Sequence, residues 1–179
     1  MEASKEELSR FIAKIIELYD QEKEKEKQRI PMYILFSGEW DERYASFFQQ
    51  IKESSSYQLI GILSREQAEK EKILKVAMKE CEKIVMREEA LERRLYSQTT
   101  VFPVLHRDIL AKAALCIPDT FEVIWMQKAM ESGGKLVVMA NGLDPFTGKE
   151  PSAYRERVLS YIKTLLEFDI EIKVDGEER

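Results

Sequence analysis

The side chains that could carry acid–base chemistry in this chain gather around its only histidine. His106 stands two positions before Asp108, and an imidazole can exchange a proton near neutral pH. The run TTVF lies just upstream, and its β-branched residues predict a strand that ends close to both side chains. His106 and Asp108 are therefore our catalytic candidates. The competing interpretation is that a single histidine at the start of a helix has only a structural role.

Small hydroxyl and glycine residues form a second candidate group. Ser37 and Gly38 end one predicted strand, and Ser64 ends another. Hydroxyl groups and free backbone N–H groups at helix N-termini are the groups that bind phosphate. These residues are therefore candidates for holding the phosphate end of a nucleotide-like ligand. The alternative is that they are ordinary turn residues.

Two familiar nucleotide-binding motifs do not match. Five residues separate Gly142 from Gly148, where a P-loop has four, and Glu150 stands where a magnesium-binding hydroxyl would be needed. A glycine-rich dinucleotide fingerprint is also missing, because Gly38 is the only glycine in the first strand–helix loop. We therefore expect neither nucleoside-triphosphatase chemistry nor nicotinamide dinucleotide binding.

Composition excludes several other classes. The 179 residues suit one domain, and the net charge of −5 argues against nucleic-acid binding. Two cysteines without C-x-x-C spacing and a single histidine indicate no metal site and a reducing, cytoplasmic environment. The N-terminus does not resemble a secretory signal, and no apolar run approaches the ~20 residues that span a bilayer.

Short apolar runs alternate with helical segments along the chain and must position the candidate residues. We expect strands at 33–36, 57–63, 83–86, 98–102, 135–140 and 168–174, and helices at 41–52, 66–79, 108–115, 121–131 and 152–166. This alternation predicts an α/β fold, a Rossmann-like three-layer sandwich with a doubly wound, mainly parallel sheet of about six strands. Ligands of such sheets bind beyond the carboxyl ends of the strands, at the topological switch point. The candidate residues stand in the loops that reach this edge.

The chain divides into a helix with a charged spacer at 1–28, a main domain at 29–174 and a tail at 175–179. An apolar stripe at helical spacing marks the first part and consists of Leu8, Phe11, Ile12, Ile15, Ile16 and Tyr19. The run QEKEKEKQ follows as a solvated spacer. The stripe predicts docking on another protein, with packing on the chain's own domain or on a neighbouring subunit as the alternative.

The stretch 99–143 resembles the flavoprotein family of phosphopantothenoylcysteine decarboxylase and its homo-oligomeric flavin-containing relatives. In that family a strand ends in a PASANT-like loop, and a helix of the form A-K-x-A-x-G-I-A-D follows. The residues that match this helix are Ala111, Lys112, Ala114, Ile117 and Asp119. Cys116 stands in place of the glycine and Pro118 in place of the alanine. The whole pattern, including GLDPFTGKEP, looks most like the flavoproteins associated with bacterial microcompartments.

The loops depart from the family pattern more than the helix does. Only Pro103 remains of the PASANT motif, so the asparagine that addresses the flavin in the family is missing. The family's catalytic histidine comes earlier in the chain and has no counterpart here. In the family, a loop with a Met-Asn pair clamps the substrate. In this chain a Met-Ala-Asn-Gly-Leu run that contains Asn141 stands in its place. The resemblance therefore implies the fold and a flavin mononucleotide (FMN) pocket, without cysteine decarboxylation.

The resemblance also implies residue roles and partners. Together with the hydroxyl and glycine residues at the strand ends, it leads us to expect Ser37, Gly38 and Ser64 at the phosphate of FMN. It places Pro103, Val104 and Arg107 along the isoalloxazine, and Asn141 in the loop that clamps the substrate in the family. It implies a redox or flavin-handling role, a homo-oligomer such as a trimer, and a microcompartment shell or cargo protein as the partner of residues 2–28. Two alternatives stay open: a degenerate, non-catalytic flavoprotein that acts as an assembly component, and a decarboxylase- or prenyltransferase-type enzyme on the same fold. Whether the chain is an enzyme is left open.

Overall fold

The computed structural model describes residues 2–51 and 56–174, with the side chains of 2–9 and 25–28 excepted. Six parallel strands form one sheet in the order β3-β2-β1-β4-β5-β6. The strands are β1 (Ile30–Leu35), β2 (Tyr57–Leu63), β3 (Lys83–Met86), β4 (Thr99–Phe102), β5 (Leu136–Met139) and β6 (Glu171–Lys173). The strand order reverses direction between β1 and β4, which makes this pair the switch point. The predicted Rossmann-like α/β fold is confirmed.

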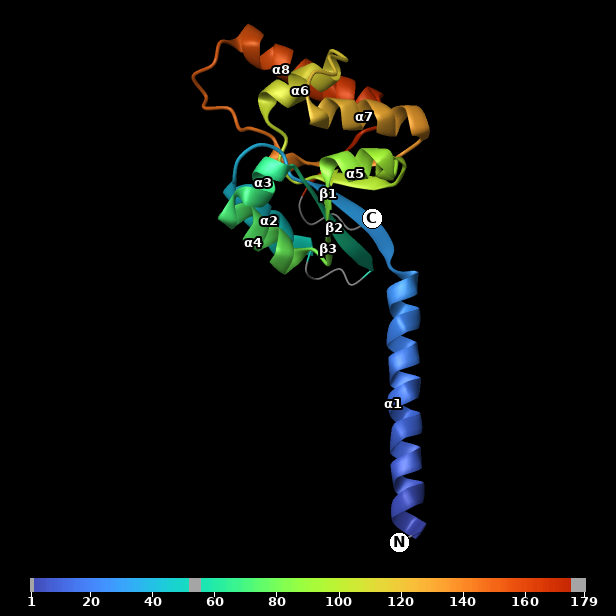
Figure 1. Ribbon diagram of the computed structural model, residues 1–179. Coiled ribbons are helices and arrows are strands. Elements are labelled where there is room, and N and C mark those ends of the chain that lie inside the picture. The colour runs from blue at the N-terminus through green and yellow to red at the C-terminus, as the bar shows by residue number, and fades with distance from the viewer. Residues whose placement is uncertain (1, 52–55, 175–179) are drawn as a thin grey trace.

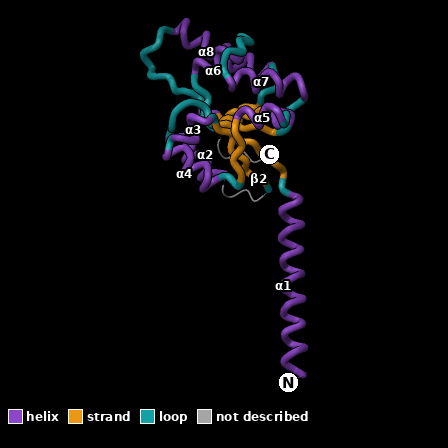
Figure 2. Tube along the Cα trace, viewed as in Figure 1, coloured by secondary structure: helices purple, strands orange, loops and turns teal. Residues whose placement is uncertain are grey.

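Helices cover both faces of the sheet (Figure 1). One face carries α2 (Glu42–Ile51), α3 (Arg65–Glu69) and α4 (Glu71–Glu80), and the other carries α5 (Arg87–Glu92), α6 (Arg107–Ala114), α7 (Phe121–Ser132) and α8 (Ser152–Glu167). Two 3₁₀ turns, η1 (Leu95–Ser97) and η2 (Ala140–Gly142), complete the connections. Figure 2 colours the strands apart from the helices and loops and shows helices on both sides of the strands.

Each face of the sheet has its own apolar core, because side chains alternate along a strand. Tyr33 and Leu35 of β1 pack toward α6, α7 and α8, whereas Ile34 and Phe36 pack toward α2 and α4. Covering on both faces explains why the central strands are almost continuously apolar. Trp125 of α7 is fully buried, and its indole N–H donates to the hydroxyl of Thr100 at 2.9 Å.

Three expectations about the elements need correction. The single helix predicted at 66–79 is two helices, because the backbone of Lys70 is extended and separates α3 from α4. The helix α5 and the turn η1 were not expected, since 87–97 shows little apolar periodicity. The last strand is shorter than predicted, because α8 continues to Glu167 and Asp169 then takes a left-handed conformation with φ of 59°.

The N-terminal helix α1 (Glu2–Gln28) is continuous and projects away from the domain (Figure 1). The charged run that we expected to be a spacer forms its last turns. All residues from 10 to 24 are exposed, so this stretch does not pack on its own domain. The expected tail at 175–179 lies outside the described residues. Over the described part of the chain, no helix combines the length and apolar character that crossing a membrane requires.

Arg29 alone separates α1 from the first strand. Its guanidinium donates to the carbonyl oxygen of Tyr57 at 2.5 Å and forms an ion pair with Glu82 at 2.6 Å. The backbone N–H of Ile30 donates to the carbonyl of Ser56 at 3.1 Å. The helix therefore leaves from the N-terminal edge of the sheet, which is the edge opposite the switch-point loops.

Candidate functional site

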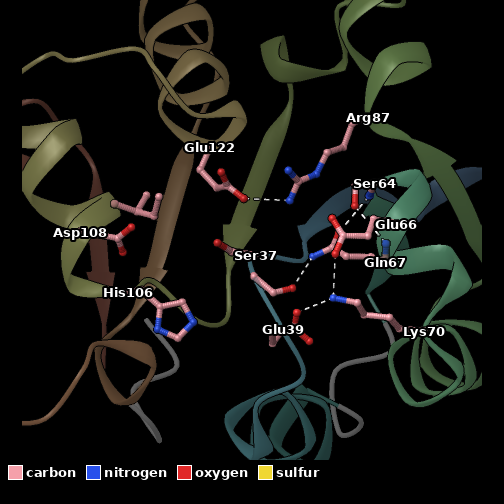
Figure 3. Close-up of a pocket in the computed structure, with 12 residues that line it drawn as sticks. Ser37, Glu39, Ser64, Glu66, Gln67, Lys70, Arg87, His106, Asp108 and Glu122 are labelled. Carbon is pink, nitrogen blue, oxygen red and sulfur yellow. Dashed lines mark hydrogen bonds and ion pairs between the residues drawn. The ribbon is translucent and has the colours of Figure 1, made fainter.

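A cleft of about 340 Å³ opens at the carboxyl edge of the sheet, where the loops after β1, β2, β3 and β4 meet (Figure 3). The residues that line it are Ser37, Gly38, Glu39, Ser64, Glu66, Gln67, Lys70, Arg87, His106, Asp108, Ile109 and Glu122. Five of the nine sequence-predicted site residues are among them, namely Ser37, Gly38, Ser64, His106 and Asp108. The rule that ligands bind beyond the carboxyl ends of the strands thus selected three of the loops that line the cleft, those after β1, β2 and β4. It also selected the loop after β5, which does not line the cleft, and it did not select the loop after β3, which does.

The side chain of Tyr44 holds the loop after β1 by hydrogen bonds to its backbone. The phenol of Tyr44 accepts from the backbone N–H of Ser37 at 2.7 Å and donates to the Ser37 carbonyl at 2.8 Å. Its ring stacks on Phe36 with centroids 4.9 Å apart. Burial raises the pKa of Tyr44, so the hydroxyl stays protonated and can donate. This pair of bonds fixes the backbone of Ser37 at the floor of the cleft.

Gln67 joins the loops after β1 and β2. Ser64 caps α3: its hydroxyl accepts from the Gln67 backbone N–H at 3.1 Å, and its own N–H donates to the Gln67 side chain at 2.9 Å. The Gln67 amide also donates to the carbonyls of Phe36 at 3.2 Å and Gly38 at 2.9 Å. Ser64 therefore caps α3 through its hydroxyl oxygen. Its hydroxyl hydrogen is not used by the cap and can still donate to a ligand in the cleft.

Gly38 and His106 face each other across a narrow part of the cleft. Gly38 has φ of 67°, and a Cβ built on it would lie 3.4 Å from Nε2 of His106. A side chain at this position would be strained by the positive φ, and its Cβ would contact the imidazole. Glycine therefore avoids this strain and leaves Nε2 of His106 uncovered on the side of Gly38.

A network of charged side chains orients His106 through its Nδ1 atom, on the side away from Gly38. Asp144 contacts Nδ1 of His106 at 3.2 Å, accepts from the backbone N–H of Arg107 at 2.8 Å, and pairs with Arg43 at 3.0 Å. Arg43 also pairs with Asp41 at 2.7 Å. Burial opposes ionisation of Asp144, but the hydrogen bonds from Arg107 and Arg43 outweigh it and hold the pKa of Asp144 below its usual value. The hydrogen bond from Arg43 likewise lowers the pKa of Asp41. The imidazole is thus anchored through one nitrogen to a carboxylate.

Arg43 also joins α2 to the loop that follows β5. Besides its ion pairs, it donates to the carbonyl oxygen of Gly142 at 2.9 Å. Gly142 packs so closely on the loop after β4 that an added Cβ would lie 1.9 Å from the Pro103 carbonyl. We call the contacts of Arg43 with Gly142 and Asp144 the Arg43 clamp.

A nearly buried ion pair forms another wall of the cleft. Arg87 and Glu122 lie 2.8 Å apart, with side chains 17 % and 8 % exposed, respectively. Arg87 also donates to the Phe36 carbonyl at 2.7 Å, and its guanidinium lies over the ring of Phe121, 4.6 Å from the centroid. Its Nε atom is buried without a hydrogen-bond partner among the described residues. The arginine is therefore held in place on the cleft side of α7.

Carboxylates outnumber cations around the cleft. Lys70 lies between two of them, Glu39, in direct contact, and Glu66 at 3.0 Å. Arg87 pairs with the third, Glu122, and Asp108 is the fourth. Figure 3 shows the Lys70 and Arg87 pairs on one side and His106 with Asp108 on the other. An anion entering the cleft must therefore compete with internal carboxylates for both cations.

The remaining predicted site residues lie outside the cleft lining. Pro103 and Val104 are buried beneath it. Arg107 turns toward the loop after β5, where it donates to the carbonyls of Asp144 and Pro145 and lies over the ring of Phe146. Asn141 is exposed in η2.

Several site residues were missed from the sequence. Arg87 directly follows a predicted strand, so the rule that selected Ser37 and Ser64 could have found it. Asp144 stands in a loop that we had selected, but nothing in its neighbours indicates a partner 38 positions away. Nothing in the sequence around Tyr44 and Glu122 indicates a role in the cleft. Both lie in helices whose sequences show an ordinary amphipathic pattern.

No protein-family model matches this chain, and no curated protein matches it by sequence. Solved structures do share its fold. An FMN-dependent cysteine decarboxylase, TvaF from thioviridamide biosynthesis, has a TM-score of 0.56 at 10 % identity, over 80 % of this chain and 89 % of that chain. A dodecameric FMN-dependent UbiX-like decarboxylase from Escherichia coli O157:H7 has a TM-score of 0.52 at 11 % identity, over 79 % and 78 %. A PPC decarboxylase mutant complexed with pantothenoylaminoethenethiol has a TM-score of 0.52 at 13 % identity, over 81 % of each chain. At these identities the likeness shows a shared α/β, Rossmann-like fold and nothing finer.

Proposed function

We propose that this chain is a flavoprotein that binds FMN in the cleft at the switch point between β1 and β4. One observation carries the proposal: a cleft of about 340 Å³ occupies the ligand-binding edge of a fold shared with structures named as FMN-dependent. The resemblance found in the sequence points to the same cofactor independently of the structural comparison.

The residues of the cleft fit such a ligand at both of its ends. Ser64 and Lys70 supply a hydroxyl and an ammonium for the phosphate, with Ser37 and the glycine backbone of Gly38 beside them. On the opposite wall, His106 supplies a flat ring. Ile109 also lines the cleft and supplies apolar surface. Because Gly38 has no side chain, the wall between these ends stays open to a planar group.

When bound, a flavin supplies a centre that accepts and returns electrons, and the protein tunes it through the groups around its ring. In this chain His106 is the group that could hold or move a proton there, from Nε2. Asp144 is a positioning residue, because it fixes the imidazole through Nδ1 without lining the cleft. These assignments support a redox or flavin-handling role, and a role other than cysteine decarboxylation is part of the same proposal.

The test is a titration of the purified chain with FMN and with riboflavin, followed by flavin fluorescence. We expect FMN to bind at least tenfold more tightly than riboflavin. Ser64→Asp should remove most of that difference, because aspartate keeps the helix cap while adding a charge that repels phosphate. Ser64→Asn is the matched control, since it caps equally well without charge. Equal FMN affinity in all three chains would show that the phosphate is not held at Ser64.

The excess of carboxylates favours a second candidate function. Glu39, Glu66, Asp108 and Glu122 disfavour an anionic ligand, as expected of a degenerate, non-catalytic flavoprotein that serves as an assembly component. This candidate predicts no saturable binding of either flavin. A homo-oligomer such as a trimer and a microcompartment partner for residues 2–28 belong with these proposals and rest on the sequence resemblance. A cytoplasmic location also belongs with them and rests on the cysteine content.

A further inference from the structure

We propose that α1 is a self-association helix, whose apolar face pairs with α1 of a second copy of this chain. The face consists of Phe11, Ile12, Ile15, Ile16, Leu18 and Tyr19, and we call it the α1 face. Each of these side chains is between 48 % and 65 % exposed. The proposal concerns assembly at the edge opposite the cleft and does not depend on flavin binding.

The α1 face is wide and apolar enough to mark an interaction surface. With 3.6 residues per turn, its six positions span an arc of roughly 160°. The exposed apolar area of these side chains is on the order of 400 Å², within the range that marks functional patches on monomers. Two such faces with their polar flanks together reach the ~1,000 Å² that a specific interface requires. The area alone therefore suffices for a pair of helices.

The charges along α1 indicate what covers the face. Between residues 10 and 24 there are three basic residues, Arg10, Lys14 and Lys23, and four acidic residues, Glu17, Asp20, Glu22 and Glu24. A helix that lies on a lipid surface carries a predominantly basic polar side, which this helix lacks. A partner of opposite charge would require one dominant sign, which is also missing. Mixed, nearly balanced charge is compatible with an identical copy, because two such helices meet without net repulsion.

The junction with the sheet makes pairing geometrically feasible. Only Arg29 separates α1 from β1, and its bonds to Tyr57 and Glu82 tie that residue to the domain. The helix extends for roughly 40 Å at 1.5 Å per residue, and it points away from all other elements (Figure 1). Two copies can therefore bring their α1 faces together without contact between the domains and without covering either cleft.

The test compares the full-length chain with two double variants that add the same charge. Ile12→Glu with Ile15→Glu places two carboxylates on the α1 face. Ala13→Glu with Gln21→Glu places two on the opposite side, at positions that are also exposed. Sedimentation gives the association constant, and hydrogen exchange of the amides between 10 and 24 reports whether α1 itself is covered.

We expect the wild-type chain and the Ala13/Gln21 variant to associate, with α1 amides that become more protected as concentration rises. The Ile12/Ile15 variant should associate at least a hundredfold more weakly and lose this protection, while its melting temperature stays the same. Equal association and protection in all three chains would overturn the proposal, even if the domains associate elsewhere. Protection of α1 that appears only with phosphatidylglycerol vesicles would overturn it in favour of a lipid surface.

Discussion

His106 and Asp144 are partners from different loops: Nδ1 of the imidazole lies 3.2 Å from the carboxylate, although the residues are 38 positions apart. The two loops follow β4 and β5, which are neighbours in the sheet. Pairing of these strands therefore brings a carboxylate behind the only histidine and leaves its other nitrogen facing Gly38. A positioned imidazole at the edge of a cleft is suited to proton transfer.

Asp144→Asn should lower the free energy of unfolding at neutral pH. It should also make that free energy fall less steeply as the pH is lowered. The pKa of Asp144 is lowered in the folded chain, so its contribution is present above its unfolded pKa of about 4 and is lost as pH falls through the lower folded value. We expect a loss of roughly 1–2 kcal/mol at pH 7 that shrinks below pH ~4. Urea unfolding across this range measures both. Asp20→Asn, on exposed α1, is the control and should change neither.

Tyr44→Phe should destabilise the chain and loosen the loop after β1. The substitution leaves the buried N–H and carbonyl of Ser37 without the partner that they share. We expect a cost of about 2 kcal/mol, or a fall of roughly 4–8 °C in melting temperature at this chain length. Tyr154→Phe, at a half-exposed position of α8, should leave the melting temperature unchanged. An equal melting temperature for Tyr44→Phe and wild type would contradict the role assigned to these bonds.

Glu122→Gln should strengthen FMN binding if the cleft holds the phosphate near its cations. The change removes one of four carboxylates from the lining and frees Arg87 from its ion pair. We expect FMN affinity to rise by on the order of fivefold, with little change for riboflavin, because the gain is electrostatic. Fluorescence titration at low salt measures it. Glu131→Gln, exposed on the same helix, is the control, and a fivefold gain there would indicate a general charge effect instead.

Cys116→Gly should stabilise the chain. Cys116 has φ of 54°, in the left-handed region just after α6, and a side chain there costs roughly 1–2 kcal/mol that glycine avoids. Part of this gain is offset by the entropy of glycine in the unfolded chain, so we expect about 1 kcal/mol and a rise of roughly 2–4 °C in melting temperature. Cys116→Ala retains the Cβ and should give no rise.

The sequence predicted the sheet and the position of the cleft better than the contacts within it. Alternation of strands and helices was enough to identify β2 and β3 with their observed bounds. It also selected the loops after β1, β2 and β4, which line the cleft, but not the loop after β3. The family has a glycine at the position of Cys116. The backbone of Cys116 adopts the left-handed conformation that glycine favours, which agrees with that pattern.

What the sequence could not predict depends on contacts between distant segments. Arg107 was expected to face the ligand, but the carbonyls of Asp144 and Pro145 draw its guanidinium toward the loop after β5. Arg87 and Glu122 are 35 positions apart, and neither has a neighbour that indicates the other. Local periodicity reports which face a side chain takes on its own element, whereas such pairs depend on how elements pack.

The Arg43 clamp has a consequence for how the chain folds. Arg43 bonds to Gly142 and Asp144 across 99 and 101 positions, so the clamp can close only after both halves of the sheet have been assembled. Because closing so long a loop costs entropy, we expect this contact to form late, after the rate-limiting step. Arg43→Met should therefore accelerate unfolding and leave the refolding rate almost unchanged. The lifetime of the native state against transient opening thus rests partly on a contact that neither half of the domain contains by itself.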